Sequence, residues 1–386
     1  MTATADLAIG VSPVDRSGLS QALRERPVIL FGAGGLGQRI RKGLLGAGIR
    51  PRAFADNNPD LWGRKIADTE ILSPDDAARL YGDSGVFVMS VWRPAHSGGL
   101  RAIDCQLRRL GCEHVVPFAH VLWLFPEQLL PHYLWDLPSK IEPEWNAIRD
   151  AYSLFEDEAS RAEFTSQVQF RMTGSFEWLP PIETHPQYFP EFLEPASEEC
   201  FVDCGAYDGD SIASFLQWTG CGFRKIVAFE ADPSCFRKLQ EFTAGRPGMG
   251  ARIECHKSAV AAASGRLRFN ATGHAGASIS SAGEIEVDAV TLDEALRDEN
   301  PTFIKMDIEG AEPDALQGAG ETIRRTQPIL AICVYHLQNH LWRVPLLMRE
   351  LFPAAKFFLR TYCLDGLDTV CYAVPEHRLV RPRGAA

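Results

Sequence analysis

The nine residues from Phe201 to Gly209, FVDCGAYDG, constrain the fold of this chain more than any other stretch. A short apolar strand ends at a carboxylate and is followed at once by a glycine turn. Strand–turn–helix units of this kind belong to parallel α/β sheets, in which the start of the helix faces a ligand at the carboxyl ends of the strands. The stretch therefore predicts a doubly wound α/β domain with a binding site at the turn.

The acids around this turn indicate the charge of the ligand. A helix start after a glycine turn normally receives a phosphate, but here Asp208 lies in the turn, Asp203 precedes it and Asp210 follows it. Three carboxylates would repel a pyrophosphate, and they suit a ligand with cationic groups and no phosphate. S-adenosylmethionine meets this description, because it carries an ammonium, a sulfonium, a ribose and an adenine.

Three later strand ends carry polar groups that would meet at the same edge of the sheet. The segment KIVAFEAD ends its strand at Glu230, about 20 residues past the turn, where an acid can accept hydrogen bonds from ribose hydroxyls. The segment PTFIKMDIEGAEPDALQGA, residues 301–319, ends its strand at Asp307 and continues into an acidic helix start. The segment CVYH ends a further strand at His336.

In these motifs the chain resembles the FkbM-type S-adenosylmethionine-dependent methyltransferases. The matching segments are FVDCGAYDGD, AFEADP at 228–233, SAV at 258–260, IKMDIEGAE at 304–312, VYH at 334–336 and LRTY at 359–362, and the resemblance covers roughly residues 130–376. It implies a class I methyltransferase domain, a seven-stranded doubly wound sheet whose last strand is antiparallel. It also implies O-methyl transfer to a hydroxyl of a sugar, a glycan or a glycosylated metabolite, and it leaves the identity of the acceptor open.

The cofactor is expected to bind at the glycine turn and at the ends of the following strands. The turn glycines would let the backbone approach it, Asp203 would orient its methionine end, and Asp208 would meet its ammonium. The alternative is that these acids only cap helix N-termini, where carboxylates are favoured anyway. The predicted cofactor-binding residues are Asp203, Gly205, Tyr207, Asp208, Gly209, Glu230, Ser258, Ala259 and Asp307, of which Ser258 and Ala259 follow from the resemblance.

Asp307, His336 and Glu309 are the predicted catalytic residues. A sugar hydroxyl has to lose its proton, so a positioned base such as Asp307 or His336, with an ordinary histidine pKa near ~6.5, would help. Glu309 and Glu312 could instead bind the acceptor hydroxyl or a divalent cation such as Mg²⁺. Three carboxylates close in sequence are not yet a coordination sphere, so no metal ligand is predicted and a divalent-metal requirement is left open.

A second glycine turn lies near the N-terminus, in the segment PVILFGAGGLGQRIRKGLLGAG. Gly32, Gly34 and Gly37 have the GxGxxG spacing between a strand and a helix, and Asp56 ends the next strand about 20 residues on. No acid occupies this turn and two arginines follow it, so a phosphate is favoured here. The motif predicts a Rossmann-like domain that binds a nucleotide or nucleotide-sugar, or that keeps the fold without the ligand.

The chain is expected to divide into two α/β domains with a connector between them. The predicted parts are a flexible tail at 1–24, the Rossmann-like domain at 25–126, a mostly helical connector or cover at 127–198, the methyltransferase domain at 199–378 and a tail at 379–386. The first domain should have four strands, within 27–31, 50–56, 85–91 and 112–118. The second should have seven, at 201–206, 225–230, 252–256, 301–307, 328–334, 356–362 and 369–374. Helices are predicted near 210–219, 234–243, 311–325 and 338–351, and an added hairpin at 266–270 and 284–292.

Composition narrows the partners and the compartment. A formal net charge of −11 at pH 7 argues against a nucleic-acid binder, because phosphate contacts need a basic surface. No run of ~18 apolar residues occurs, so no membrane span is expected. The ten cysteines lack metal-binding spacings, which favours reduced thiols in the cytoplasm. A small-molecule acceptor of sugar or glycan type is the expected partner, and a homo-oligomer is left open.

Two other functions stand beside methyl transfer. The N-terminal turn could serve an NAD-dependent oxidoreductase or epimerase of nucleotide sugars, with Asp56 favouring NAD over NADP. No Tyr-x-x-x-Lys or other hydride-transfer pair is visible near that domain. The chain could also be a non-catalytic nucleotide-sugar-binding protein. That function would require the turn at Gly205 to bind no cofactor, but none of the residues expected for cofactor binding is missing from this turn.

Overall fold

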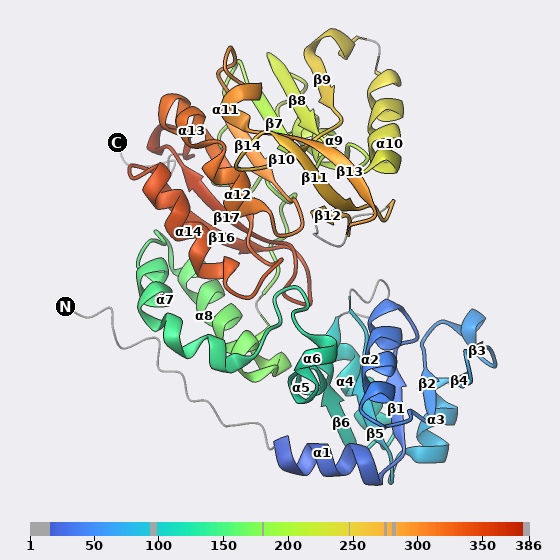
Figure 1. Ribbon diagram of the computed structural model, residues 1–386. Coiled ribbons are helices and arrows are strands. Elements are labelled where there is room, and N and C mark those ends of the chain that lie inside the picture. The colour runs from blue at the N-terminus through green and yellow to red at the C-terminus, as the bar shows by residue number, and fades with distance from the viewer. Residues whose placement is uncertain are drawn as a thin grey trace. The chain divides into compact units, whose positions relative to one another are not determined.

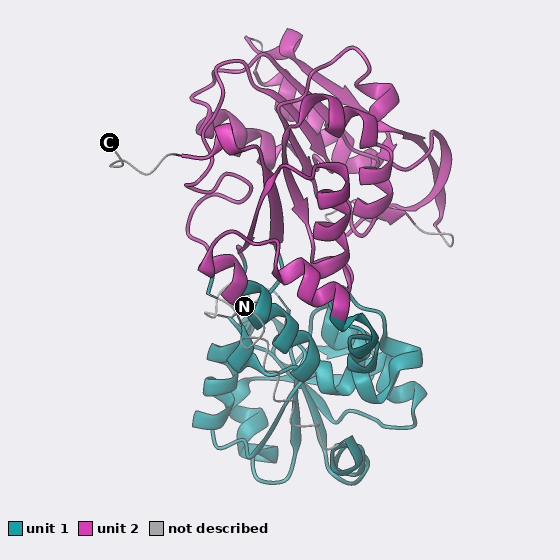
Figure 2. Cartoon of the chain, turned by 90° about the vertical axis from the view of Figure 1, so that its left-hand side faces the viewer, with its two compact units in different colours: residues 1–145, 163–182, 363–367 teal, residues 146–162, 183–362, 368–386 magenta. Residues whose placement is uncertain are grey.

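In the computed structural model, the chain forms two compact units that are interleaved along the sequence (Figure 2). The described residues are 16–92, 99–179, 181–246, 248–273, 276–279 and 283–380. The first unit takes residues 1–145, 163–182 and 363–367, and the second takes 146–162, 183–362 and 368–386. The predicted domain boundaries remain predictions.

The two predicted tails fall mainly on residues 1–15 and 381–386, which lie outside the described residues. The end of the first tail is helical instead, because α1 spans Arg16–Glu25 and buries Leu23. One buried leucine on an otherwise polar helix is a weak signal in the sequence, which explains why this helix was not predicted.

The first unit is built on a six-stranded sheet in the order β3-β4-β2-β1-β5-β6 (Figure 1). Its strands are β1 (Val28–Phe31), β2 (Ala53–Ala55), β3 (Lys65–Ile66), β4 (Thr69–Leu72), β5 (Val86–Met89) and β6 (His114–Pro117). All pairs are parallel except β3 with β4. The four predicted strands are present, but the prediction of four was wrong: β3 and β4 have only 2 and 4 residues and carry little periodic signal.

The arrangement of this sheet creates a switch point between β1 and β5. Every residue of these two strands is buried, as expected for parallel strands covered on both faces. From β1 the chain proceeds to one edge of the sheet, and from β5 it proceeds to the other. Ligands of open α/β sheets bind at such a reversal, outside the carboxyl ends of the strands.

The helices up to the second domain follow the predicted strand–helix alternation and then the predicted helical connector. They are α2 (Gly35–Gly46), α3 (Pro74–Tyr81), α4 (Leu100–Arg109), α5 (Phe118–Leu124), α6 (Pro126–Leu129), α7 (Trp145–Tyr152) and α8 (Glu158–Thr173). Single 3₁₀ turns occur at Pro59–Leu61, Pro138–Lys140, Glu142–Glu144 and Phe176–Trp178.

The second unit contains the predicted seven-stranded sheet, in the order β16-β17-β15-β14-β7-β8-β9 (Figure 1). Its strands are β7 (Cys200–Cys204), β8 (Lys225–Phe229), β9 (Ile253–His256), β14 (Phe303–Met306), β15 (Ile329–Cys333), β16 (Lys356–Thr361) and β17 (Thr369–Val374). The last strand, β17, is antiparallel to both neighbours, and the other pairs are parallel. The doubly wound fold with an antiparallel last strand is thereby confirmed.

One helix of this unit differs from its prediction. The expected helix at 311–325 is two helices with Gly318 between them, and an added Cβ at this glycine would lie 2.1 Å from the backbone oxygen of Ala261. The helices of the unit are α9 (Asp210–Trp218), α10 (Pro233–Ala244), α11 (Leu292–Ala295), α12 (Glu312–Gln317), α13 (Gly320–Thr326) and α14 (His340–Leu351), with 3₁₀ turns at Gly250–Arg252 and Glu376–Arg378.

A smaller sheet in the order β10-β13-β11-β12 follows β9. Its strands are β10 (Ala259–Val260), β11 (Gly265–Asn270), β12 (Ser278–Ile279) and β13 (Ile285–Val290). The predicted hairpin is confirmed as the antiparallel pair of β11 and β13, and β10 and β12 widen it. Its apolar face includes Phe269, Val287 and Ala289, which form one core cluster with Ala231 and Ala259.

Candidate active site

The glycine turn after β7 is shaped by close approach to its neighbours. Gly205 has φ +80° and Gly209 has φ +93°, which glycine adopts without penalty. A Cβ at Gly205 would lie 2.0 Å from the backbone oxygen of Asp307, and one at Gly209 would lie 2.6 Å from the ring of Phe242. Tyr207, between the two glycines, also has a positive φ of 47°. The turn therefore contacts the end of β14 directly.

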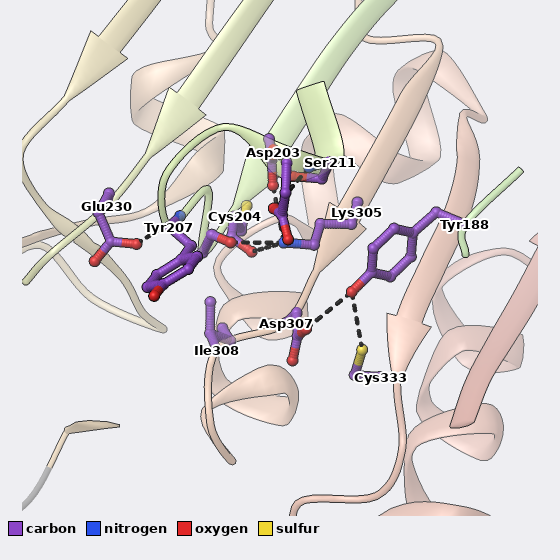
Figure 3. Close-up of polar contacts among 12 residues, drawn as sticks. Tyr188, Asp203, Cys204, Tyr207, Ser211, Glu230, Lys305, Asp307, Ile308 and Cys333 are labelled. Carbon is purple, nitrogen blue, oxygen red and sulfur yellow. Dashed lines mark hydrogen bonds and ion pairs between the residues drawn. The ribbon is translucent and has the colours of Figure 1, made fainter. Parts of the chain in front are cut away.

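A buried ion pair lies beneath this turn. Lys305 Nζ is 2.9 Å from Asp203 Oδ1, and the Asp203 side chain has no exposed surface (Figure 3). The same ammonium donates to Gly205 O at 2.6 Å and Cys204 O at 3.4 Å, and Ser211 Oγ donates to the Asp203 carboxylate. A carboxylate without exposed surface cannot touch a ligand, so we propose that Asp203 positions the turn instead of contacting the methionine end of the cofactor.

Glu230 joins the turn to the end of β8. Its Oε2 accepts a hydrogen bond from Tyr207 N at 2.9 Å (Figure 3), and its Oε1 accepts one from Asp232 N at 2.7 Å. Burial raises the pKa of this carboxyl, and its side chain keeps 8% of its surface exposed. Each carboxylate oxygen can accept a second hydrogen bond. Glu230 is therefore oriented, with lone pairs left to accept further hydrogen bonds, and its role as a ribose ligand stays a prediction.

Ser258 offers a specific test of whether S-adenosylmethionine fits. It follows β9 and is 5% exposed, and its Oγ has no hydrogen-bond partner. Buried hydroxyls are nearly always hydrogen-bonded, so this one is available to a ligand. The next residue, Ala259, is also buried. An orphaned hydroxyl beside a small apolar residue suits the polar edge of an adenine, and the cofactor fits this end of the sheet.

Asp307 is the most densely contacted acid of the site. Tyr188 donates to its Oδ2 at 2.8 Å and Tyr335 donates to its Oδ1 at 3.1 Å, and His336 Nε2 lies 3.1 Å from Oδ1. Its side chain is 24% exposed. Burial would raise the pKa of Asp307, but the hydrogen bond and charge of His336, with Lys305, lower it well below its usual range. Asp307 is therefore a fixed carboxylate that is ionised and weakly basic.

His336 lies among acids on both sides of its ring. Its Nδ1 is 2.9 Å from Glu312 Oε1, and its Nε2 faces Asp307 at 3.1 Å and Glu309 at 3.8 Å. Burial would lower the pKa of this imidazole, but Glu312 and Asp307 raise it well above its usual value. An imidazolium has no free lone pair, so His336 can act as the predicted base only after it loses that proton.

Glu312 is structural, whereas Glu309 reaches the surface. The fully buried Glu312 carboxylate accepts from Ile308 N at 2.9 Å and Gly310 N at 3.4 Å and lies 3.3 Å from His340 Nδ1. Glu309 has φ +57° and a side chain that is 17% exposed. Among the described residues, no group of three or more His, Cys, Asp or Glu side chains is arranged to hold a metal ion.

We expect the charge on His336 to make stability fall as pH rises. Above about pH 6.5 the unfolded histidine is neutral while the folded one keeps its proton, so the folded state loses up to about 1.4 kcal/mol per pH unit until the folded pKa is passed. Thermal unfolding between pH 6.5 and 9 should show this slope in the wild type and a flatter one in His336→Gln. His256→Gln is the control, because His256 pairs with Glu254 at a half-exposed position. An unchanged slope in His336→Gln would contradict the assigned charge.

Sequence reasoning missed three residues of this site. Ser211 holds Asp203 beside Lys305, and Tyr335 and Tyr188 hold Asp307. Tyr335 lies within the recognised VYH segment and could have been found there. Tyr188 comes from a loop 119 residues before Asp307, and no local pattern marks it.

The N-terminal glycine turn is also assembled as predicted. Asp56 Oδ2 accepts from Ala33 N at 2.8 Å, which ties the end of β2 to the turn. A Cβ at Gly37 would lie 1.9 Å from Gly32 O, and one at Gly32 would lie 2.5 Å from Val91, whereas Gly34 has nothing within 4 Å. Gly32 and Gly37 therefore serve packing, and Gly34 faces open space where a ligand could approach.

The two arginines after this turn make different contacts within the unit. Arg41 donates to Thr69 and forms an ion pair with the carboxylate of Asp68, so its charge is neutralised, contrary to expectation. Arg39 donates to Leu129 O and Pro131 O, which are uncharged groups. The local sequence does not reveal these long-range contacts.

The fold and the site together define a class I S-adenosylmethionine-dependent methyltransferase. Residues 203–360 match the Methyltransferase FkbM domain, which agrees with the resemblance seen in the motifs of this region. No curated protein matches the chain. No helix within the described residues has the length and apolar character needed to cross a bilayer.

Two solved structures resemble the chain to different extents. Methyltransferase FkbM from Methylobacillus flagellatus KT is 22% identical, with a TM-score of 0.77 over 96% of this chain and 95% of that one. An rRNA methylase from Streptococcus thermophilus is 15% identical, with a TM-score of 0.31 over 48% of this chain and 91% of that one. The first confirms that the fold extends over nearly the whole chain.

Proposed function

We propose that this methyltransferase transfers a methyl group from S-adenosylmethionine to a hydroxyl of a sugar, a glycan or a glycosylated metabolite. The observation that carries the proposal is Asp307, a partly exposed carboxylate at the end of β14 whose backbone touches the glycine turn at Gly205. Tyr188 and Tyr335 fix its orientation. A fixed, ionised carboxylate beside the cofactor turn suits an acceptor that donates a hydrogen bond, as a hydroxyl does.

The chain would contribute binding and alignment more than strong base chemistry. When bound, S-adenosylmethionine supplies an electrophilic methyl group. Glu230 would accept hydrogen bonds from its ribose, Ser258 would meet its adenine, and Asp208 would face its ammonium. Much of the acceleration of a displacement can come from holding the two reacting atoms close and in line. These residues would therefore hold one reactant while Asp307 holds the other.

Proton removal from the acceptor fits the lowered pKa of Asp307. A hydroxyl oxygen that has gained a methyl group is a far stronger acid than a carboxylic acid, so a weak base can accept its proton late in the reaction. Asp307 would bind the hydroxyl and then take the proton, and the neighbouring His336 imidazolium would keep the carboxylate ionised beforehand. Glu309, on the exposed side of the same turn, would contact the acceptor.

The N-terminal unit is proposed to bind a nucleotide or nucleotide-sugar at Gly32, Gly34, Gly37 and Asp56. The open space at Gly34 and the switch point between β1 and β5 support this proposal. A cytoplasmic setting is also proposed, because all ten cysteines are free thiols, as is usual in a reducing compartment.

Calorimetric titration with S-adenosylhomocysteine tests the cofactor site. We expect micromolar binding by the wild type, about tenfold weaker binding by Glu230→Gln, which loses charge-assisted hydrogen bonds to ribose, and unchanged binding by Gly34→Ala. Titration with NAD and UDP-sugars should show the reverse pattern if the N-terminal turn is a nucleotide site. Unchanged binding of S-adenosylhomocysteine by Glu230→Gln would contradict the assigned ribose contact.

A panel of glycosides and non-glycosylated alcohols, incubated with methyl-labelled S-adenosylmethionine, then tests the acceptor class. Label should enter glycosides and remain low with simple alcohols. Asp307→Asn should transfer label poorly while it still binds S-adenosylhomocysteine, because the amide cannot take the proton. Transfer to amines or thiols in place of hydroxyls would overturn the proposed acceptor chemistry.

A further inference from the structure

The smaller sheet is attached directly to the residues proposed to bind adenosine. Ala231 follows Glu230 in sequence and Ala259 follows Ser258, and both alanines share a core cluster with Phe269 and Val287 of the smaller sheet. Ala231 and Ala259 are each 8% exposed. The apolar face of the sheet therefore packs against the backbone that carries the two proposed adenosine ligands.

Asp232 fastens this sheet to the same region by hydrogen bonds. The residue is 1% exposed. Its Oδ1 accepts from Ser234 N at 2.8 Å and Cys235 N at 3.1 Å, which caps helix α10. Its Oδ2 accepts from Thr272 N at 3.0 Å and Gly273 N at 2.9 Å, in the segment after β11. Capping of the helix needs only the hydrogen bonds from Ser234 and Cys235. The hydrogen bonds from Thr272 and Gly273 instead tie the segment after β11 to the start of α10.

Lys238, six residues after Asp232 on α10, completes a closed set of contacts. Its Nζ donates to Gly273 O at 3.3 Å and lies 5.0 Å from the centre of the Tyr207 ring. Tyr207 N donates to one oxygen of Glu230, and Asp232 N donates to the other. The contacts thus run from Glu230 through Asp232 and Gly273 to Lys238, and return through Tyr207.

We propose that Asp232 is a positioning residue for the cofactor. Asp232 holds the 272–273 segment against α10 and so sets the position of Lys238, which contacts the Tyr207 ring. The backbone N–H groups of Tyr207 and of Asp232 itself then hold the two oxygens of the Glu230 carboxylate. Its effect falls on the adenosine half of the cofactor, since the set joins the turn after β7, the end of β8, α10 and the 272–273 segment, and none of these contacts is to Asp307. This inference rests on the proposed ribose contact of Glu230.

A capping role alone is the alternative, and the chain provides a matched control for it. Asp293 accepts from Thr322 N at 2.7 Å and Glu321 N at 3.1 Å, so its carboxylate also binds two backbone N–H groups at the start of a helix in the same unit. Asp293 makes no contact in the set around Glu230. Loss of its cap lowers stability without a route to the cofactor.

The experiment measures the affinities of S-adenosylhomocysteine and of adenosine by calorimetry for wild type, Asp232→Asn, Lys238→Met and Asp293→Asn. Asp232→Asn should weaken both ligands by about tenfold, because an amide cannot replace hydrogen bonds to a charged carboxylate. Lys238→Met should weaken both by about threefold, since an exposed interaction is worth less. Asp293→Asn should bind both ligands like the wild type while melting earlier. Lys238→Arg should bind both ligands more tightly than Lys238→Met does, because arginine keeps the positive charge beside the Tyr207 ring.

Three outcomes would overturn the proposal. Wild-type affinity in both Asp232→Asn and Lys238→Met would leave only a capping role. Loss of S-adenosylhomocysteine affinity without loss of adenosine affinity would place the effect at the methionine end. If the wild type bound neither ligand, the proposed cofactor site itself would be wrong. If the wild type bound both ligands and the variants did too, only the inference about Asp232 would be wrong. Lys238→Met keeps every bond of Asp232, so it reports on the contact set even if Asp232→Asn does not fold.

Discussion

Replacement of Lys305 by methionine is expected to destabilise the second unit by about 3–5 kcal/mol, the usual cost of leaving one member of a buried ion pair without its partner. Lys305 and Asp203 are both almost fully buried, at 3% and 0% side-chain exposure. Burial alone would lower the pKa of Lys305, but Asp203 and Asp307 raise it above its usual range. The ammonium is therefore charged at neutral pH, and methionine would remove that charge while filling a similar volume.

Lys225 provides the control for this prediction, because it is the same residue type with two carboxylate partners at a less buried position. Its Nζ lies 2.7 Å from Glu299 and 2.8 Å from Glu254, with 26% of its side chain exposed. Lys225→Met should cost at most about 1 kcal/mol, as for surface pairs. Thermal and urea unfolding of both variants gives the comparison. Similar losses in the two variants would show that burial of the Lys305 pair is not what matters.

The double variant Asp203→Asn with Lys305→Met checks the cause of the loss. It removes both charges, and the amide can still receive the hydroxyl of Ser211. If the cost of Lys305→Met comes from an uncompensated carboxylate, the double variant should be more stable than the single one. Further destabilisation by the second substitution would indicate that the carboxylate holds the turn by itself.

Gly205→Ala is the second substitution with a large expected effect. A non-glycine residue at φ +80° costs about 1–2 kcal/mol, and overpacking typically costs a further 1–3 kcal/mol or so. The added Cβ would lie 2.0 Å from the backbone oxygen of Asp307, and a backbone atom cannot move aside cheaply. The turn and the end of β14 must therefore separate. We expect both a lower melting temperature and loss of S-adenosylhomocysteine binding.

Gly220→Ala isolates the first of these causes, the conformational cost of a positive φ. Gly220 also has a positive φ, of 58°, but a Cβ there meets nothing within 4 Å. It should cost only the conformational part, and it should leave binding of S-adenosylhomocysteine unchanged. Calorimetry and thermal unfolding of the two alanine variants give the comparison. Equal effects of the two substitutions would mean that contact between the turn and Asp307 is unimportant for the site.

The positions of the acids at the site could be predicted because strand ends are a local property. Asp203, Glu230 and Asp307 each follow an apolar run, and the carboxyl ends of parallel strands meet at one edge of a sheet. The same reasoning placed Gly205 in the turn. Nothing in that reasoning depended on which strands are neighbours, and the sheet order was supplied by the resemblance to a family.

Burial and protonation at the site could not be predicted in this way. Whether an acid contacts a ligand or a buried lysine depends on which side chain of the next strand faces it, and Lys305 lies 102 residues from Asp203 in the sequence. His336 looked like a base with an ordinary pKa, and its acidic neighbours make it a cation. Electrostatic neighbours of this kind come from tertiary contacts, on which pKa values depend strongly.

The sequence by itself determined the α/β class, the seven strands of the second unit and the two glycine turns, because apolar periodicity and turn residues act over a few positions. Only the tertiary structure decided that Asp203 is buried against Lys305, that Tyr188 holds Asp307, that α12 and α13 are separate helices, and that Arg41 pairs with Asp68. Each of these depends on backbone or charged atoms from distant parts of the chain, and their approach follows from packing of the whole unit rather than from any local pattern.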